Sequence, residues 1–255
     1  MRTHTRRRQR PLGPRLALLA PAALTAAMLA LAGCSALPAA HPLAAPAQGS
    51  QARSTALAAP AAGTVRQGTT GTVDAVAIGD SIAFGKGVTP EQAWPALVSA
   101  DHGWRLTDLA VSGSGFVKPG WNGTTYRQQV DAALRLHPQV ILLAATRNDR
   151  EQSLEAVTAN ADRMLRELRE KFPDATIIGV TGIWGADAPP ATMTHVDGIV
   201  GDAVRDVDGT WLDIGFPLVG HPDLVQADGI HPNAAGQKVV ARTIESKLRP
   251  LNLAL

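Results

Sequence analysis

Four side chains that could together attack an ester carbonyl are spread over three loops of this sequence. Ser81 follows an apolar run of strand length, Asn148 follows another such run, and Asp228 and His231 stand just before the last predicted helix. A serine hydroxyl is a weak nucleophile until an adjacent base takes its proton. An ordinary histidine, with a pKa of about 6.5, can do so near neutral pH. Asp228 could orient the imidazole, and Asn148 could donate an N–H to the oxyanion. These residue types predict acyl transfer.

The chain alternates between apolar runs and amphipathic stretches from residue 73 onward. This alternation predicts one α/β domain with a parallel sheet, helices on both faces and right-handed crossovers. Ligands of such sheets bind beyond the carboxyl ends of the strands, so the loops carrying Ser81, Asn148 and His231 should meet at one edge. The predicted strands are residues 73–78, 106–111, 139–145, 175–184 and 210–216, and the predicted helices lie near 90–100, 124–136, 150–171, 193–206 and 234–248.

The motifs at this edge resemble those of the SGNH (GDSL-type) hydrolase family over residues 73–255. They are Gly79-Asp80-Ser81-Ile82, then Gly113, then Asn148-Asp149, and last Asp228-Gly229-Ile230-His231, in that order. The resemblance implies a flavodoxin-like three-layer α/β/α sandwich with a five-stranded parallel sheet. It also implies the hydrolysis of carboxylic esters without a cofactor.

The same resemblance implies a role for each matching residue. Ser81 would be the nucleophile, His231 the base and Asp228 the residue that orients His231. The N–H groups of Ser81 and Gly113 and the side chain of Asn148 would form the oxyanion hole.

The sequence departs from the family pattern at two places. Thr146 stands where the family usually has a glycine two residues before Asn148, and it could narrow the pocket there. Two glycines, Gly113 and Gly115, compete for the oxyanion position, and Gly113 fits the family pattern better. Neither departure removes a reacting group.

The N-terminus has the pattern of an export signal. Six arginines and no acid precede residue 34, and an apolar stretch from residue 16 to 32 follows them. Leu31-Ala32-Gly33-Cys34 resembles a bacterial lipobox, which implies cleavage before Cys34 and lipidation of its thiol. An ordinary secretory peptide and an uncleaved anchor helix are the alternatives, and Arg6-Arg7-Arg8 leaves a twin-arginine route open.

Composition divides the chain into three parts. Residues 1–33 are the predicted signal peptide, and residues 34–72, rich in Ala and Pro, are a predicted disordered tether. Residues 73–255 are the predicted catalytic domain. Without the six N-terminal arginines the chain has 18 basic and 22 acidic residues, a net charge of −4. A nucleic-acid partner is therefore not expected. Cys34 is the only cysteine, so an internal disulfide is excluded.

Other chemically capable side chains have plainer interpretations. Asp80 and Asp149 are expected to cap loops or helix starts. Arg147 and Arg150 are expected to be solvated or paired with acids. Trp121 could line an acyl or sugar pocket, whereas the tryptophans at 94, 104 and 184 should pack in the core or at its rim. A metal site built from His221, Asp223, Asp228 and His231 is a minor alternative, because no HExxH or Cys/His cluster supports it.

We therefore predict an exported serine esterase of the cell envelope, either anchored through Cys34 or secreted. Its substrate would be a small acyl ester or an acylated glycan, and we expect a monomer. An acyltransferase or deacetylase acting on envelope glycans could use the same residues. A non-catalytic binding lipoprotein is a third interpretation, but it would not need Ser81, Asn148, Asp228 and His231 together.

Overall fold

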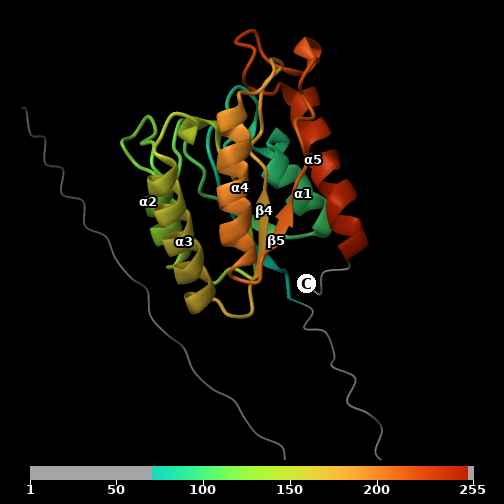
Figure 1. Ribbon diagram of the computed structural model, residues 1–255. Helices are drawn as coiled ribbons and strands as arrows, with labels where there is room; N and C mark the ends of the chain where they lie inside the picture. Colours follow the sequence, from blue (N-terminus) through green and yellow to red (C-terminus); the bar gives the residue numbers. More distant parts are fainter. Residues whose placement is uncertain (1–70, 252–255) are drawn as a thin grey trace, which may run out of the picture. The chain divides into compact units, whose positions relative to one another are not determined.

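A five-stranded, wholly parallel sheet forms the centre of the fold in this computed structural model, which describes residues 71–251 (Figure 1). The strand order β2-β1-β3-β4-β5 is that of a flavodoxin-like sheet. The strands are β1 (Asp74–Ile78), β2 (Arg105–Asp108), β3 (Val140–Ala144), β4 (Thr176–Val180) and β5 (Thr210–Leu212). The loops that follow their carboxyl ends lie at the top of Figure 1.

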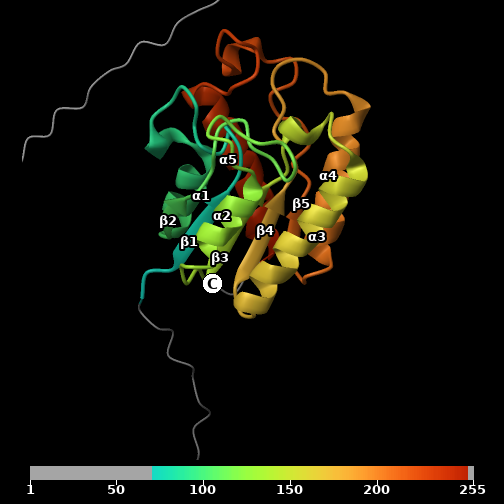
Figure 2. The same ribbon diagram turned by 90° about the vertical axis from the view of Figure 1, so that its left-hand side faces the viewer.

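Helices cover both faces of the sheet, as predicted for an α/β/α sandwich (Figure 2). On one face lie α2 (Tyr126–Ala133), α3 (Leu154–Lys171) and α4 (Ala191–Arg205). On the other lie α1 (Trp94–His102) and α5 (Ala234–Leu248). The described residues also contain four short 3-10 helices: η1 (Pro90–Gln92), η2 (Arg147–Asp149), η3 (Pro222–Leu224) and η4 (Arg249–Leu251). Among the described residues, no helix is long and apolar enough to cross a membrane.

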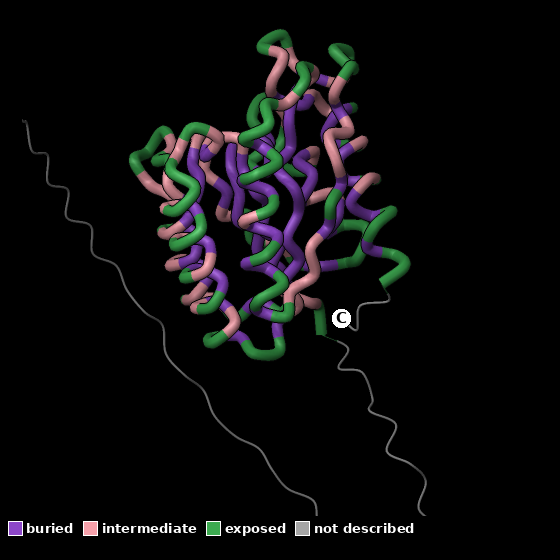
Figure 3. The backbone as a smooth tube through the Cα atoms, viewed as in Figure 1, coloured by how far each residue is buried: buried purple, intermediate pink, exposed green. Residues whose placement is uncertain are grey.

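Alternate residues of the central strands pack into two separate cores, because successive side chains point to opposite faces of a sheet. In β3, Ile141 and Leu143 pack with α2, α3 and α4, whereas Val140 and Leu142 pack with α1 and α5. All five residues of this central strand are buried. Figure 3 shows the result as a buried centre between two partly exposed helical layers.

Most predicted boundaries agree with the structure, and α5 covers the same residues as the prediction. Four of the five predicted strands extend past the observed carboxyl ends, and the first, at 73–78, ends with β1 at Ile78. The run at 175–184 ends as a strand at Val180, although residues 181–185 remain buried. Hydrophobicity reports burial rather than ladder pairing, so a buried loop that follows a strand prolongs the pattern.

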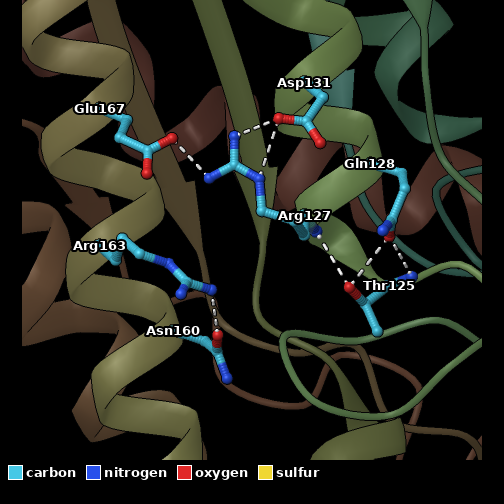
Figure 4. Close-up of polar contacts among 7 residues, drawn as sticks. All are labelled: Thr125, Arg127, Gln128, Asp131, Asn160, Arg163 and Glu167. Atoms are coloured by element: carbon cyan, nitrogen blue, oxygen red, sulfur yellow. Dashed lines mark hydrogen bonds and ion pairs between the residues drawn. The ribbon is translucent and has the colours of Figure 1, made fainter.

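A polar cluster on the surface fastens α2 to α3. The Arg127 guanidinium lies between Asp131, one turn later on α2, and Glu167 on α3 (Figure 4). Nearby, Thr125 caps α2 by accepting the Arg127 N–H at 3.2 Å. We call Arg127, Asp131 and Glu167 the helix clamp.

Candidate active site

The turn that follows β1 places Ser81 at the carboxyl edge of the sheet. The chain reverses at once, because the Phe84 N–H donates to the Asp80 carbonyl and the Lys86 N–H to the Ser81 carbonyl, both at 2.9 Å. Gly79 permits this turn, since a Cβ there would collide with the Cβ of Ala83. Ser81 is buried by the loops around it.

Ser81, His231 and Asp228 form one hydrogen-bonded chain. The Ser81 Oγ lies 2.9 Å from Nε2 of His231, and Nδ1 of His231 lies 2.6 Å from Oδ2 of Asp228. A carboxylate can only accept, so Nδ1 carries the proton and Nε2 is free to accept one from the serine hydroxyl. The structure thus brings together three residues that are up to 150 positions apart in sequence.

Asp228 is held in its ionised form. Its slight burial acts to raise the pKa, but hydrogen bonds from the His231 N–H, the His231 ring and the Ile230 N–H outweigh it. The pKa of Asp228 therefore lies well below its usual value. The ionised carboxylate can therefore accept the Nδ1–H of His231 and hold the ring in one orientation.

The loop that carries His231 is fixed on both sides. The Gln226 N–H donates to the His231 carbonyl at 2.8 Å, and Asn233 caps α5 immediately afterwards. The Gly229 carbonyl accepts the Ala186 N–H at 3.1 Å, which ties this loop to the one after β4. Gly229 itself has a φ of 69°, a conformation that favours glycine.

The N–H groups of the two candidate glycines differ in their hydrogen bonding. The Gly115 N–H donates to the Lys118 carbonyl at 2.8 Å, so it is already used. Within the described residues, neither the Gly113 nor the Ser81 N–H has a hydrogen-bond acceptor. Gly113 also adopts a φ of 80°. Gly113 and Ser81 therefore each have a backbone N–H that no acceptor among the described residues occupies.

Asn148 lies at the same edge, in η2 after β3. Its Nδ2 donates to the Ser114 carbonyl at 2.9 Å and lies 3.5 Å from Asp80 Oδ2, at the limit of a hydrogen bond. The amide is thus fixed against the loop that carries Gly113. One of its two N–H groups is used by Ser114, and the other is at most weakly engaged.

Asp80 and Thr146 connect the first and third strand ends beneath these groups. Asp80 accepts the Ile82 N–H at 2.9 Å and the Thr146 hydroxyl at 2.6 Å. The Thr146 hydroxyl also accepts the Asn148 N–H at 3.1 Å. Burial raises the pKa of Asp80 against the lowering effect of these bonds. Thr146, the departure from the family pattern, is completely buried. Its two hydrogen bonds join η2 to the Ser81 turn.

Asp149 holds the loop after Gly115. Its carboxylate accepts the N–H groups of Phe116, Val117 and Lys118 at 2.6, 3.2 and 2.9 Å. Gly115 packs so closely on this carboxylate that a Cβ would collide with it. Burial raises the pKa of Asp149, while the three hydrogen bonds act to lower it. The expectation that Asp80 and Asp149 order loops agrees with these contacts.

Two glutamines that sequence reasoning missed also support the site. Gln129 of α2 accepts the Gly79 N–H and donates to the Gly79 carbonyl, each at 2.9 Å. Gln237 of α5 donates to the Ile82 carbonyl at 3.0 Å and accepts the Trp94 N–H. A glutamine on the apolar face of an amphipathic helix was the available signal, because a buried amide requires partners.

The two arginines of this loop do not share one environment. Arg150 pairs with Glu151, as expected. Arg147 is half-buried, has no ion-pair partner among the described residues, and stacks over Trp184. Trp184 is buried, as predicted.

Two further predictions concern metal binding and the N-terminus. Within residues 71–251 no three His, Cys, Asp or Glu side chains gather as a metal site would require. His231 is engaged with Ser81 and Asp228 instead. The predicted signal peptide and Cys34 lie outside the described residues.

Comparison with known proteins agrees with this geometry. The profile of the GDSL-like lipase/acylhydrolase family matches residues 77–239. Because the match spans more than half of the sequence, the chain belongs to this family of SGNH (GDSL-type) hydrolases.

Individual relatives are more distant. GDSL lipase Rv0518 of Mycobacterium tuberculosis is 26% identical over 189 residues, which cover 68% of this chain and 79% of that protein. The psychrotrophic esterase EstA from Pseudoalteromonas sp. superposes with a TM-score of 0.57 at 16% identity, covering 70% of this chain and 97% of EstA. A family two carbohydrate esterase from Clostridium thermocellum gives 0.56 at 17%, covering 70% and 63%. At these identities the two structures show a shared fold.

Proposed function

We propose that this protein is a serine esterase that hydrolyses carboxylic esters through an acyl-enzyme on Ser81. The observation that carries the proposal is the continuous contact from Ser81 Oγ to His231 Nε2 at 2.9 Å and from His231 Nδ1 to Asp228 at 2.6 Å. Such a chain gives a serine hydroxyl a base and gives that base a fixed tautomer. Membership of the GDSL-like lipase/acylhydrolase family supports the same chemistry.

Each proton and bond in this reaction has a defined destination. The Ser81 Oγ attacks the ester carbonyl carbon while its proton passes to His231 Nε2. The tetrahedral intermediate collapses, the bond to the leaving oxygen breaks, and the alcohol departs with the proton from His231. Water then attacks the acyl-serine carbonyl and gives its proton to His231. Collapse releases the carboxylic acid and returns that proton to Ser81.

Three donors would stabilise the oxyanion. They are the N–H groups of Ser81 and Gly113, which have no acceptor among the described residues, and the side chain of Asn148. Donors that are already oriented need little reorganisation when negative charge develops on the carbonyl oxygen.

The nucleophile is tested by replacing Ser81→Ala. Covalent labelling by a fluorophosphonate and turnover of p-nitrophenyl acetate should both disappear, while the melting temperature changes little. Ser99→Ala is the matched control, since Ser99 is another buried serine, and its hydroxyl has no partner within the described residues. Retained labelling or turnover in a folded Ser81→Ala protein would disprove the proposal.

One feature favours acylated glycans as a second candidate substrate. The Trp121 side chain is 79% exposed, and the backbone N–H of this residue donates to the Ser112 carbonyl next to Gly113. An exposed indole beside the oxyanion donors could stack on a sugar ring. Acetate release from an acetylated glycan should then fall in Trp121→Ala, while turnover of p-nitrophenyl acetate stays unchanged. Equal losses on both substrates would remove this candidate. Adding an alcohol acceptor and measuring ester formation would separate transferase from hydrolase activity.

We also propose that the enzyme acts outside the cytoplasm, anchored by lipid at Cys34. The sequence Leu31-Ala32-Gly33-Cys34 after a basic and apolar N-terminus supports this. Stable anchoring requires more than one acyl chain, which a bacterial lipoprotein normally provides. Cys34→Ser should therefore move the protein out of the membrane fraction or block its processing. Unchanged fractionation and processing would indicate an ordinary secreted protein.

A further inference from the structure

Arg147 is a cation beside the proposed catalytic groups, and within residues 71–251 it has no counter-ion. It directly precedes Asn148, and its Cζ lies 4.0 Å from the centre of the Trp184 ring. Among the described residues its guanidinium donates no hydrogen bond and forms no ion pair. Other arginines of this chain do pair with acids, including neighbouring Arg150 with Glu151. Arg147 is thus oriented by an aromatic face and keeps its N–H donors available for a ligand.

Partial burial increases what the Arg147 guanidinium would gain from an acceptor. Burial lowers the pKa of Arg147, and Arg150 adds to the effect, while Asp80, Asp228 and Asp187 oppose it from a distance. A guanidinium partly withdrawn from water gains most from an acceptor that matches its planar fork. A carboxylate is such an acceptor.

The contacts also connect Arg147 to the loop that carries His231. Trp184, on which Arg147 stacks, is two residues before Ala186. Ala186 donates to the Gly229 carbonyl in the loop that carries His231. In the proposed reaction His231 Nε2 gives its proton to the departing oxygen, so the alcohol must lie beside that imidazole. Arg147 and His231 are therefore connected through one pair of packed loops.

We propose that Arg147 binds a carboxylate on the alcohol part of the substrate, so that the natural ester carries a negative charge on its leaving group. This inference rests on the proposed esterase activity. A single cation stacked on Trp184, with its neighbour Arg150 already paired, matches one singly charged group. Arg147 is thus a specificity-determining residue that reads charge, while Ser81, His231 and Asp228 perform the chemistry.

Two esters of similar shape test this proposal. 4-Acetoxybenzoate carries a carboxylate on the leaving phenol, and 4-acetoxybenzamide replaces it with a neutral amide. Arg147→Gln should lower kcat/KM for the acid by about 10- to 100-fold, the range expected for losing a hydrogen-bonded charge pair. The loss should lie mainly in KM. The value of kcat/KM for 4-acetoxybenzamide should change by less than about threefold, because this ester lacks the carboxylate that Arg147 would contact.

A control variant separates a local contact from a general change of charge. Arg166→Gln removes one positive charge from the exposed face of α3, where Arg166 bonds Asp162, and it should affect both esters equally and little. Comparing each variant with the wild type on the same ester cancels the difference between the two leaving groups. Arg147→Lys keeps the charge without the fork, and it should restore part of the preference for the acid.

The possible failures point to different errors. Equal losses on both esters in Arg147→Gln would assign Arg147 to the support of the loop and overturn the inference. Unchanged kcat/KM on the acid would overturn it as well. If the wild type hydrolyses neither ester nor p-nitrophenyl acetate, the proposed function itself fails. If the wild type cleaves the ester of 4-acetoxybenzamide but Arg147→Gln does not change the preference between the two esters, the esterase proposal stands and only the carboxylate site is rejected.

Discussion

We call the carboxyl edge of the sheet, where Ser81, Asn148 and His231 lie, the catalytic edge. The carboxylates at the catalytic edge and those of the helix clamp have different partners. Asp149 is buried and accepts three backbone N–H groups. Among the described residues, Asp131 and Glu167 in the clamp bond only the side chain of Arg127, and their side chains are 46% and 36% exposed. Removing a buried acceptor leaves its N–H donors unpaired, whereas water can hydrate the charges of an exposed ion pair that is broken. The first kind of contact shapes a loop, and the second fastens two helices that already pack.

The largest effect at the catalytic edge is expected on the rate. Asn148→Ala keeps Ser81 and His231 but removes one donor to the developing oxyanion. Loss of such a donor typically lowers kcat by ~10²–10³, or about 3–4 kcal/mol. Because this charge exists only in the transition state, KM should change little.

Asn160→Ala is the control for this variant, since Asn160 bonds the Ala156 carbonyl on the partly exposed face of α3. Its steady-state kinetics should match those of the wild type. A folded Asn148→Ala enzyme with wild-type kcat would show that the oxyanion hole lies elsewhere, even if Ser81 is essential.

The next effect compares the two kinds of carboxylate directly. Asp149→Ala leaves three buried or part-buried N–H groups without their acceptor and should lower the free energy of unfolding by about 2–4 kcal/mol. Asp131→Ala should cost about 1 kcal/mol or less. Urea unfolding of both variants measures the difference. If the two costs are equal, the contrast drawn between buried and exposed carboxylates is wrong.

The fold and the candidate site could be predicted from the sequence where the pattern that carries them is local. Motifs that are local in sequence, such as Asp228-Gly229-Ile230-His231, led to groups that the structure brings within hydrogen-bond distance of one another. The α/β alternation predicted the layers for the same reason, since each element has its own periodicity. Contacts between distant segments left no local pattern.

The missed residues illustrate this limit. Gln129 bonds Gly79 across 50 positions. Helical periodicity places residue 129 on the buried face of α2, but it does not show which backbone groups the amide meets. The stack of Arg147 on Trp184 depends on how the loops after β3 and β4 pack together. Loop packing is a tertiary property, and neither composition nor spacing encodes it in a form that can be read directly.

A smaller effect involves a buried carboxyl away from the catalytic edge. Burial raises the pKa of Asp197 to about 7; the Gly182 N–H lowers it and the charge of Asp213 raises it. The unfolded pKa is about 3.9, so folding favours the protonated form. The stability from this group is therefore fully present below about pH 4 and is lost as the pH rises through about 7.

Asp197→Asn removes this titration and keeps an oxygen for the Gly182 N–H, which Asp197 now accepts at 2.7 Å. From pH 5 to pH 8, the free energy of unfolding of the variant should rise relative to that of the wild type by about 1–3 kcal/mol. Thermal unfolding at both pH values measures the gain. Asp202→Asn, on the exposed face of the same helix, should show no comparable pH dependence. A wild-type pH dependence in Asp197→Asn would place the titrating group elsewhere.

The smallest effect is expected in the helix clamp itself. Arg127→Met keeps most of the aliphatic stem between α2 and α3 and removes the charge that joins Asp131 to Glu167. Partly exposed ion pairs contribute little, so the free energy of unfolding should fall by about 1 kcal/mol or less. High salt should shrink the difference further, because the wild-type pair is screened. Arg163→Met, which loses only a bond to Asn160 on α3, should cost still less. A loss of about 3 kcal/mol or more in Arg127→Met that persists in high salt would mean that the clamp is as tightly coupled to the fold as the buried carboxylates of the catalytic edge.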